Sequence, residues 1–265
     1  MIRSVFAKTL YDKRGFIVGW SLALAGFAAL LVVFYPAMRQ DGALDELAKT
    51  MPPAFQGLVG NLADLSQFDT YIASQLFDIR LPLLAGIMAL ILGLGLSVSD
   101  EERGELRTLL SLPISRTKLF IQRWLAMATI LLLTIIGLLI GMYASMPFVD
   151  GATIEPAVLI RLVGMTGLMM VAFGTIPFAV GIASGKRALA TAVGIGVVMG
   201  SFILSTFGSA VGWLQGFETF SLLHYFPAVD IVKTGISMGD VYALTGVTTV
   251  LLLMALLLFR TRDVA

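Results

Sequence analysis

Long apolar stretches alternate with polar connections along this chain. Crossing the hydrocarbon core of a bilayer as a helix takes about 20 apolar residues. Six stretches meet that length, and they cover residues 16–37, 81–98, 124–146, 162–183, 188–214 and 241–259. The pattern predicts an all-α, polytopic membrane protein with six transmembrane helices, forming a single domain over residues 1–265.

Three of the polar connections are predicted to do more than reverse the chain. Residues 1–14 carry apolar side chains at helical spacing beside basic ones, which favours an amphipathic elbow helix at the inner membrane interface over an unstructured basic tail. The first span is too long for a signal peptide and should remain in the mature protein. The outer segment 38–80 is large enough to fold. The aromatic outer segment 216–240 is expected to form short helices at the membrane surface.

Residues 99–116 join the second and third spans and carry far more charge than a short turn needs. Seven side chains are charged, namely Asp100, Glu101, Glu102, Arg103, Glu105, Arg107 and Arg116. They are accompanied by four leucines, Leu106, Leu109, Leu110 and Leu112. Ser99 and Glu102 have the spacing of a capping box, and Pro113 disfavours helical geometry at Leu112. The pattern predicts a short helix with one charged face, suited to docking another protein, with Ser115 starting the next helix. A solvated loop at the bilayer surface is the alternative.

Composition agrees with a membrane protein. Of 265 residues, 58% are hydrophobic and only 13% are charged, whereas about a quarter are charged in soluble domains. The chain has no cysteine and a single histidine, His224, so we expect no disulfide, no cysteine nucleophile and no metal site. His224 is predicted to be an interfacial side chain.

Charge is distributed unevenly between the two sides of the predicted bundle. With the N-terminus inside, the inner segments hold 13 of the 18 Lys and Arg residues. The outer segments hold five basic residues against eleven acids. Since Lys and Arg near the spans favour the cytoplasmic side, both termini and residues 99–116 are predicted to be cytoplasmic. The basic residues then need no nucleic-acid partner to explain them.

Candidate chemistry within the predicted spans is sparse. None of the six cores as drawn contains Asp, Glu, Lys or Arg, which argues against an ion-coupled carrier. Asp78 and Arg80 precede the second span and Arg161 precedes the fourth, so these residues either face an outer vestibule, pair with other loops, or reach lipid headgroups. Residues 181–186 read Gly-Ile-Ala-Ser-Gly-Lys, but the spacing does not fit a nucleotide-binding loop and predicts a tight turn. Any ATP hydrolysis must then reside on another polypeptide.

Small residues recur at helical spacing in two spans. Gly137 and Gly141 form one pair, and the longer series consists of Ala188, Ala192, Gly196 and Gly200. Small side chains let helix backbones approach closely. The two faces are predicted to pack against other helices, either within the chain or in a second copy.

The charged segment carries a family resemblance. Glu102-x-Gly104, followed by Leu109-Leu110-Ser111-x-Pro113-Ile114-Ser115-Arg116 after a second span, resembles the permease subunits of type-2 ABC exporters. The elbow helix, the six spans and the aromatic segment before span six are similar as well. In that family, the segment between spans two and three is the coupling helix. Glu105 departs from the pattern, in which small or hydroxyl residues are common.

The resemblance implies a permease in the plasma or inner membrane of a prokaryotic cell. It would pair with a second permease, commonly an identical copy, and with two cytoplasmic ATPase subunits that bind ATP and Mg²⁺. The chain itself would hold no cofactor and catalyse no reaction, and its other contacts would be with membrane lipid. The residues expected to couple to the ATPase are Asp100, Glu101, Glu102, Gly104, Glu105, Leu106, Leu109, Leu110, Pro113 and Arg116. A membrane scaffold or sensor that recruits a soluble partner through residues 99–116 is the alternative function.

Overall fold

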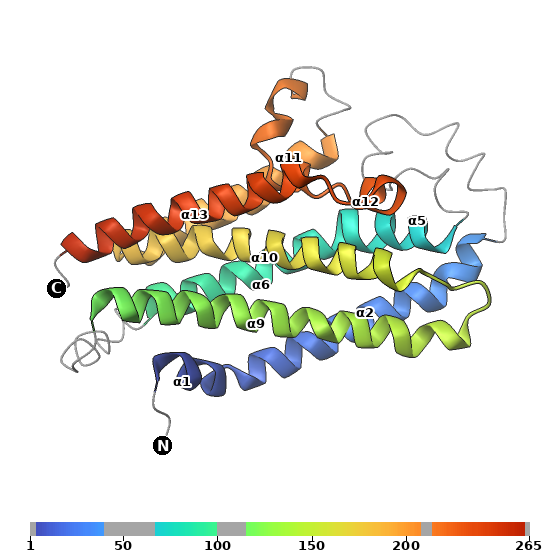
Figure 1. Cartoon of the computed structure of the whole chain (residues 1–265), viewed down its shortest axis with the longest axis horizontal. Helices are drawn as coiled ribbons and strands as arrows, with labels where there is room; N and C mark the ends of the chain where they lie inside the picture. Colours follow the sequence, from blue (N-terminus) through green and yellow to red (C-terminus); the bar gives the residue numbers. More distant parts are fainter. Residues whose placement is uncertain (1–3, 40–66, 100–114, 208–213, 263–265) are drawn as a thin grey trace.

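The structure is a computed structural model that describes residues 4–39, 67–99, 115–207 and 214–262. Within these ranges the chain forms helices and connections, without strands. Six helices are long and apolar enough to cross a membrane, which confirms the predicted all-α class and the number of spans. They lie roughly side by side, and the two termini are at the same end of the bundle (Figure 1).

The chain enters the bundle through a short helix. α1 (Val5–Asp12) begins at Ser4, whose hydroxyl accepts a hydrogen bond from the Ala7 N–H at 3.2 Å. It has no buried residue and turns directly into α2 (Arg14–Arg39), which is span one. The predicted N-terminal helix is therefore confirmed as a helix, and its place at the membrane interface stays a prediction.

Span two is longer than its apolar core suggested. It runs from Phe68 to Ser97 and consists of α5 (Phe68–Ile72), the π-helix η2 (Ala73–Arg80) and α6 (Leu81–Ser97). The prediction that it begins at residue 81 is wrong, because charged side chains in η2 interrupt the hydropathy without interrupting the helix. Tyr71 fixes the N-terminal end of this span to span one by donating to the Leu31 carbonyl oxygen at 3.1 Å.

Spans three, four and six also extend beyond the predicted cores, whereas the described helix of span five ends at Phe207, before the predicted end at residue 214. Span three is α9 (Arg116–Ser145), followed by η3 (Met146–Phe148), and span four is α10 (Pro156–Ser184). Span five is α11 (Arg187–Phe207), and span six is α13 (Met238–Thr261). Span four lies at the centre of the bundle and packs against α6, α9, α11 and α13.

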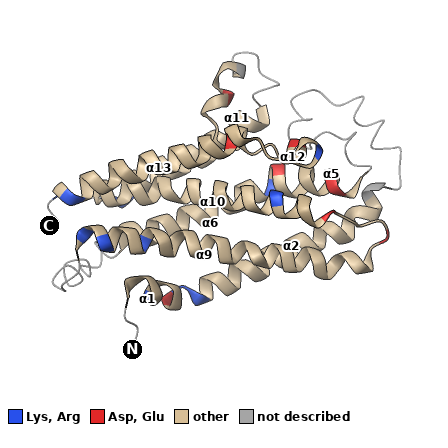
Figure 2. Cartoon of the chain, in the orientation of Figure 1, with Lys and Arg blue, Asp and Glu red and all other residues tan. Residues whose placement is uncertain are grey.

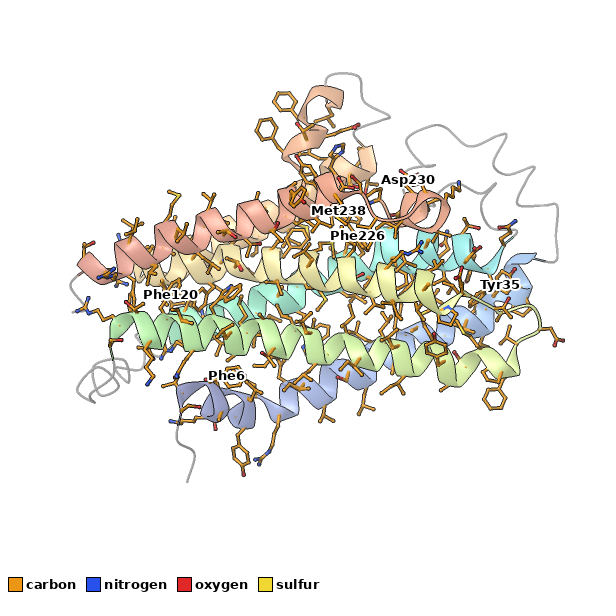
Figure 3. The ribbon with its side chains drawn as sticks, in the orientation of Figure 1. Phe6, Tyr35, Phe120, Phe226, Asp230 and Met238 are labelled. Atoms are coloured by element: carbon orange, nitrogen blue, oxygen red, sulfur yellow. The ribbon has the colours of Figure 1, made fainter. Side chains whose placement is uncertain are left out.

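Within residues 214–237, the described part of the connection between spans five and six, the chain forms short helices, as predicted. These are η4 (Gln215–Phe220), η5 (Leu222–Tyr225) and α12 (Ala228–Thr234). Ser221 holds this connection on span five, since its hydroxyl donates to the Ser201 carbonyl oxygen at 2.9 Å while Leu222 N–H donates to the Ser201 hydroxyl at 3.2 Å. The ring of Phe226 is buried in the main core (Figure 3).

Candidate coupling site at the end of the bundle that holds both termini

The structure describes both ends of the charged segment but not its middle. Helical backbone resumes at Ser99, and the chain is next described at Ser115, whose hydroxyl accepts from the Lys118 N–H at 3.2 Å. This confirms Ser115 as the start of span three. The predicted coupling residues that lie outside the described ranges are Asp100, Glu101, Glu102, Gly104, Glu105, Leu106, Leu109, Leu110 and Pro113, and their roles stay predictions.

The first end of the segment is packed tightly against span four. A Cβ added at Gly181 of α10 would overlap the Ser97 hydroxyl, and one added at Gly93 of α6 would overlap the Gly174 backbone. Gly93 also lies against the ring of Pro177, around which α10 continues as one helix. The two helices therefore touch at backbone distance in the last turns before the charged segment begins.

The second end is fastened to span six by Arg116. Its Nη1 donates to the carbonyl oxygens of Phe259 (3.2 Å) and Arg262, at the C-terminal end of α13. Its guanidinium carbon also lies 6.0 Å from the centre of the Phe259 ring. The sequence placed Arg116 at the end of the charged segment but gave no sign of this contact, because the acceptors are backbone atoms 143 and 146 positions away.

Beneath Arg116, an aromatic cluster joins spans three, four and six. The ring centre of Phe120 lies 5.4 Å from that of Phe178 and 6.4 Å from that of Phe259. All three side chains are buried, and Phe120 can be seen between the helices near the end of the bundle that holds both termini (Figure 3). The cluster gives the Arg116 contact an apolar and well-packed base.

A second arginine continues the connection to span four. Arg262 donates from Nη1 to the Ile182 carbonyl oxygen at 3.1 Å, in the last turn of α10. Its guanidinium lies against Gly185, which ends α10 with a φ of 66°. That left-handed conformation favours glycine and closes the helix C-terminus.

The same turn tests the prediction that residues 181–186 form a tight turn and not a nucleotide-binding loop. Gly181 to Ser184 belong to α10, Gly185 ends the helix, and α11 begins at Arg187. The first backbone N–H groups of this stretch are therefore part of a helix and do not form a cradle for phosphate. The predicted tight turn is confirmed.

The three outer residues singled out from the sequence all lie within helices. Asp78 and Arg80 are in η2 and Arg161 is in α10, so the helices as they fold include charged residues that lie outside the apolar cores drawn from the sequence. Their polar neighbours explain why: Asp78 Oδ1 accepts from the Ala228 N–H at 2.8 Å, and Arg80 Nη1 donates to Gln75 Oε1 at 2.6 Å. Arg161 is exposed and lies beside the turn that follows α12. Asp78 and Arg161 lie beside α12 or the turn that follows it, whereas an outer vestibule stays a prediction.

Arg123 is a further charged residue that the sequence analysis treated only as part of the inner charge. It lies in α9, two turns after Arg116, and its side chain is 3% exposed. Lys and Arg are rarely buried to this degree unless they are paired. Figure 2 shows basic residues gathered at the end of the bundle that holds both termini, and a second group beside α12.

Comparison with known proteins bears on the whole chain. The model of the ABC-2 family transporter proteins matches residues 6–264, which is nearly its full length. No curated protein matches. Six membrane-spanning helices and a segment held at both ends on the side of the termini agree with that family. The chain belongs to the ABC-2 family of transporter proteins and is a membrane-spanning permease subunit of an ABC transporter.

Proposed function

We propose that this permease forms the translocation pathway of an exporter whose energy comes from two separate cytoplasmic ATPase subunits. Residues 99–116 dock on the ATPase, and their movement on ATP binding and hydrolysis is passed to the spans. ATP and Mg²⁺ are held by the partner, and the permease contributes no catalytic residue. Both termini and the docking segment lie in the cytoplasm of a prokaryotic cell, and the outer segments face away from it.

The observation that carries this proposal is the attachment of both ends of the segment. Ser97 lies against Gly181 of span four, and Arg116 is bound to the end of span six. A segment that merely reversed the chain would need neither attachment. A force applied between these two points would be transmitted to the helices instead of being absorbed by a loose loop, which supports coupling over simple recruitment of a soluble partner.

The second permease is proposed to be another copy of this chain, contacting it through span five. Gly137 and Gly141 are already used within the chain, because Cβ atoms there would overlap the backbones of Ser21 and Ala25 in span one. In contrast, Gly196 and Gly200 have nothing within 4 Å of such an added atom. Together with the exposed Ala188 and Ala192, they leave an open face on α11 that a second copy can approach closely.

The test is to purify the full-length permease from membranes of cells that also express the neighbouring ATPase gene. We expect an ATPase subunit to copurify and to hydrolyse ATP in the complex. A Glu101→Lys, Glu102→Lys variant should lose this subunit, because docking would meet reversed charge. The matched control is Asp150→Lys, which makes a similar charge reversal at an exposed position in the connection between spans three and four.

The outcomes separate the two candidate functions. If the ATPase still copurifies with the Glu101→Lys, Glu102→Lys variant, docking through this segment is wrong. If the parent chain captures a soluble protein without ATPase activity through the same residues, the chain is a scaffold or sensor and the exporter proposal fails. Loss of the ATPase from the Asp150→Lys control as well would also contradict a docking role specific to residues 99–116.

A further inference from the structure

Two arginines connect the ends of three helices at the inner side of the bundle. Arg116, the first residue of α9, binds the Phe259 carbonyl oxygen at the end of α13. Arg262, just beyond α13, binds the Ile182 carbonyl oxygen at the end of α10. The carbonyl oxygen of Arg262 is itself an acceptor for Arg116, so the two contacts share a residue and form one continuous chain.

The acceptors suit an arginine at each position. The last carbonyl groups of an α-helix lack intrahelical partners and carry partial negative charge. A guanidinium offers several N–H donors in a fixed planar fork, so it can bind more than one carbonyl oxygen without losing its charge. Arg116 does this with two acceptors on span six. A lysine would retain the charge but not the fork.

The surroundings make these contacts firmer than surface ion pairs. Phe259 is 1% exposed and lies under the Arg116 guanidinium, while Phe120 and Phe178 pack next to it. Both arginines are themselves partly buried. Because an apolar base excludes water, each hydrogen bond to a carbonyl oxygen is stronger than it would be in solvent. The helix ends are thus held in one arrangement.

We propose that Arg116 and Arg262 are positioning residues that make the inner ends of spans three, four and six move as one unit. Displacement of residues 99–116 then reaches span six through Arg116 and span four through Arg262. This inference rests on the proposed function for the source of the displacement. The connection itself belongs to the permease alone and can be measured without the ATPase.

The absence of cysteine allows paired labels without background. In the full-length chain in lipid nanodiscs, Lys118→Cys on α9 and Leu257→Cys on α13 carry nitroxide labels, both at exposed positions. Pulsed electron spin resonance then measures the distance distribution between them. We expect a narrow distribution in the labelled parent, and a broader one shifted to longer distances in Arg116→Met. For Arg262→Met the same change is expected between Leu257→Cys and Lys186→Cys, an exposed position just after α10, because the Arg262 side chain binds the end of α10. Arg116→Lys should give an intermediate width.

The matched control is Arg260→Met, which removes an exposed arginine from the last turn of α13. Its distribution should equal that of the parent. An unchanged distribution in both Arg116→Met and Arg262→Met would overturn the inference. Equal broadening in Arg260→Met would overturn it as well, because general loss of positive charge would then explain the effect. Arg116→Lys preserves the test if the Met variants fail to insert.

A second measurement tests the transmission of movement in the complex with its ATPase. Adding ATP with vanadate should shift the parent distance from Lys118→Cys on α9 to Ile91→Cys, the exposed site on α6. The parent distance from Lys118→Cys to Leu257→Cys on α13 should stay constant, because spans three and six move together. With Arg116→Met, the distance to α13 should shift as well. If it stays constant as in the parent, the positioning role is wrong. If no ATPase binds, the proposed function fails, and the nanodisc distances still decide the connection.

Discussion

Asp78 and Ala228 are joined by a 2.8 Å hydrogen bond across 150 positions of the chain. The carboxylate belongs to span two, and the N–H belongs to the first residue of α12. Pro227, which precedes α12, gives it no side-chain cap, so Asp78 supplies the missing acceptor from another helix. This bond and the contact of Ser221 with Ser201 of span five fix the connection between spans five and six at two points.

Replacing Asp78 should loosen α12. Loss of a capping carboxylate in Asp78→Ala is expected to cost about 0.5–2 kcal/mol of stability, and Asp78→Asn should cost less because it retains an acceptor. Thermal unfolding in detergent and protease sensitivity of residues 226–236 measure the effect. The exposed Asp150→Ala is the control. Equal loss in Asp78→Asn and Asp78→Ala would contradict a capping role.

The close crossing of spans one and three predicts a large effect of one methyl group. In Gly141→Ala, the added Cβ would overlap the Ala25 backbone, which cannot move aside as a flexible side chain can. Overpacking of this kind costs about 1–3 kcal/mol. Gly164→Ala, with nothing within 4 Å, is the matched control in another helix and should be neutral or stabilising. Unfolding temperature in detergent compares the two, and an equal response would rule out the crossing.

Spans three and four share a polar contact in their packed interior. Trp124 Nε1 donates to Thr175 Oγ1 at 2.9 Å, while the Thr175 hydroxyl donates to the Val171 carbonyl oxygen at 2.7 Å. Hydrogen bonds between membrane helices contribute about 0.6 kcal/mol on average. A double-mutant cycle of Trp124→Phe and Thr175→Val should give a coupling energy of that size. Strictly additive losses would mean that the bond contributes nothing.

The open face of span five predicts the site of self-association. In Gly196→Leu, the new side chain has room within one copy, so folding should be preserved while close approach of a second copy is blocked. Single-molecule photobleaching in nanodiscs should show mainly one step for this variant and two for the parent. Gly164→Leu is the control on a different exposed glycine. Two-step bleaching in Gly196→Leu would exclude this face as the interface.

The proposed orientation can be tested with single cysteines, because the chain has none of its own. Ser4→Cys and Lys118→Cys should react with a membrane-impermeant maleimide only in inside-out vesicles. Asp150→Cys and Glu218→Cys should react with the same reagent only from the outer face of the membrane, in intact cells whose outer envelope lets the maleimide pass. The positions are at opposite ends of the described spans, and the reverse pattern would invert the topology.

The sequence predicted the number of spans and the identity of the helices, since both depend on apolar length alone. It failed where a charged residue within a helix finds a partner from elsewhere. In the sequence, Asp78 and Arg80 mark the boundary of the apolar core of span two. The helix nevertheless begins at Phe68, because Ala228 and Gln75 supply hydrogen-bond partners for these charged side chains. Hydropathy averages over neighbours in sequence and carries no information about partners in space.

At the candidate coupling site, too, the sequence predicted local features and missed contacts between distant parts of the chain. Ser115 was identified because a helix cap is a local pattern. Arg116 was placed at the correct end of the segment, but its acceptors are backbone carbonyl oxygens of span six, and every residue has a carbonyl group. No residue type at positions 259 or 262 signals such a contact. This contact can be recognised only from the tertiary structure, which brings the end of span six next to Arg116.

In the π-helix Ala73–Arg80, each backbone hydrogen bond spans five residues instead of the four of an α-helix, so this stretch holds an extra residue compared with the α-helices on either side. An α-helix turns by about 100° per residue, as follows from 3.6 residues per turn. A return of this stretch to α-geometry would therefore rotate everything on its outer side by roughly that angle. Span two thus contains a stretch at which a change between π- and α-geometry would turn its two halves against each other, with the backbone hydrogen bonds exchanged, not lost.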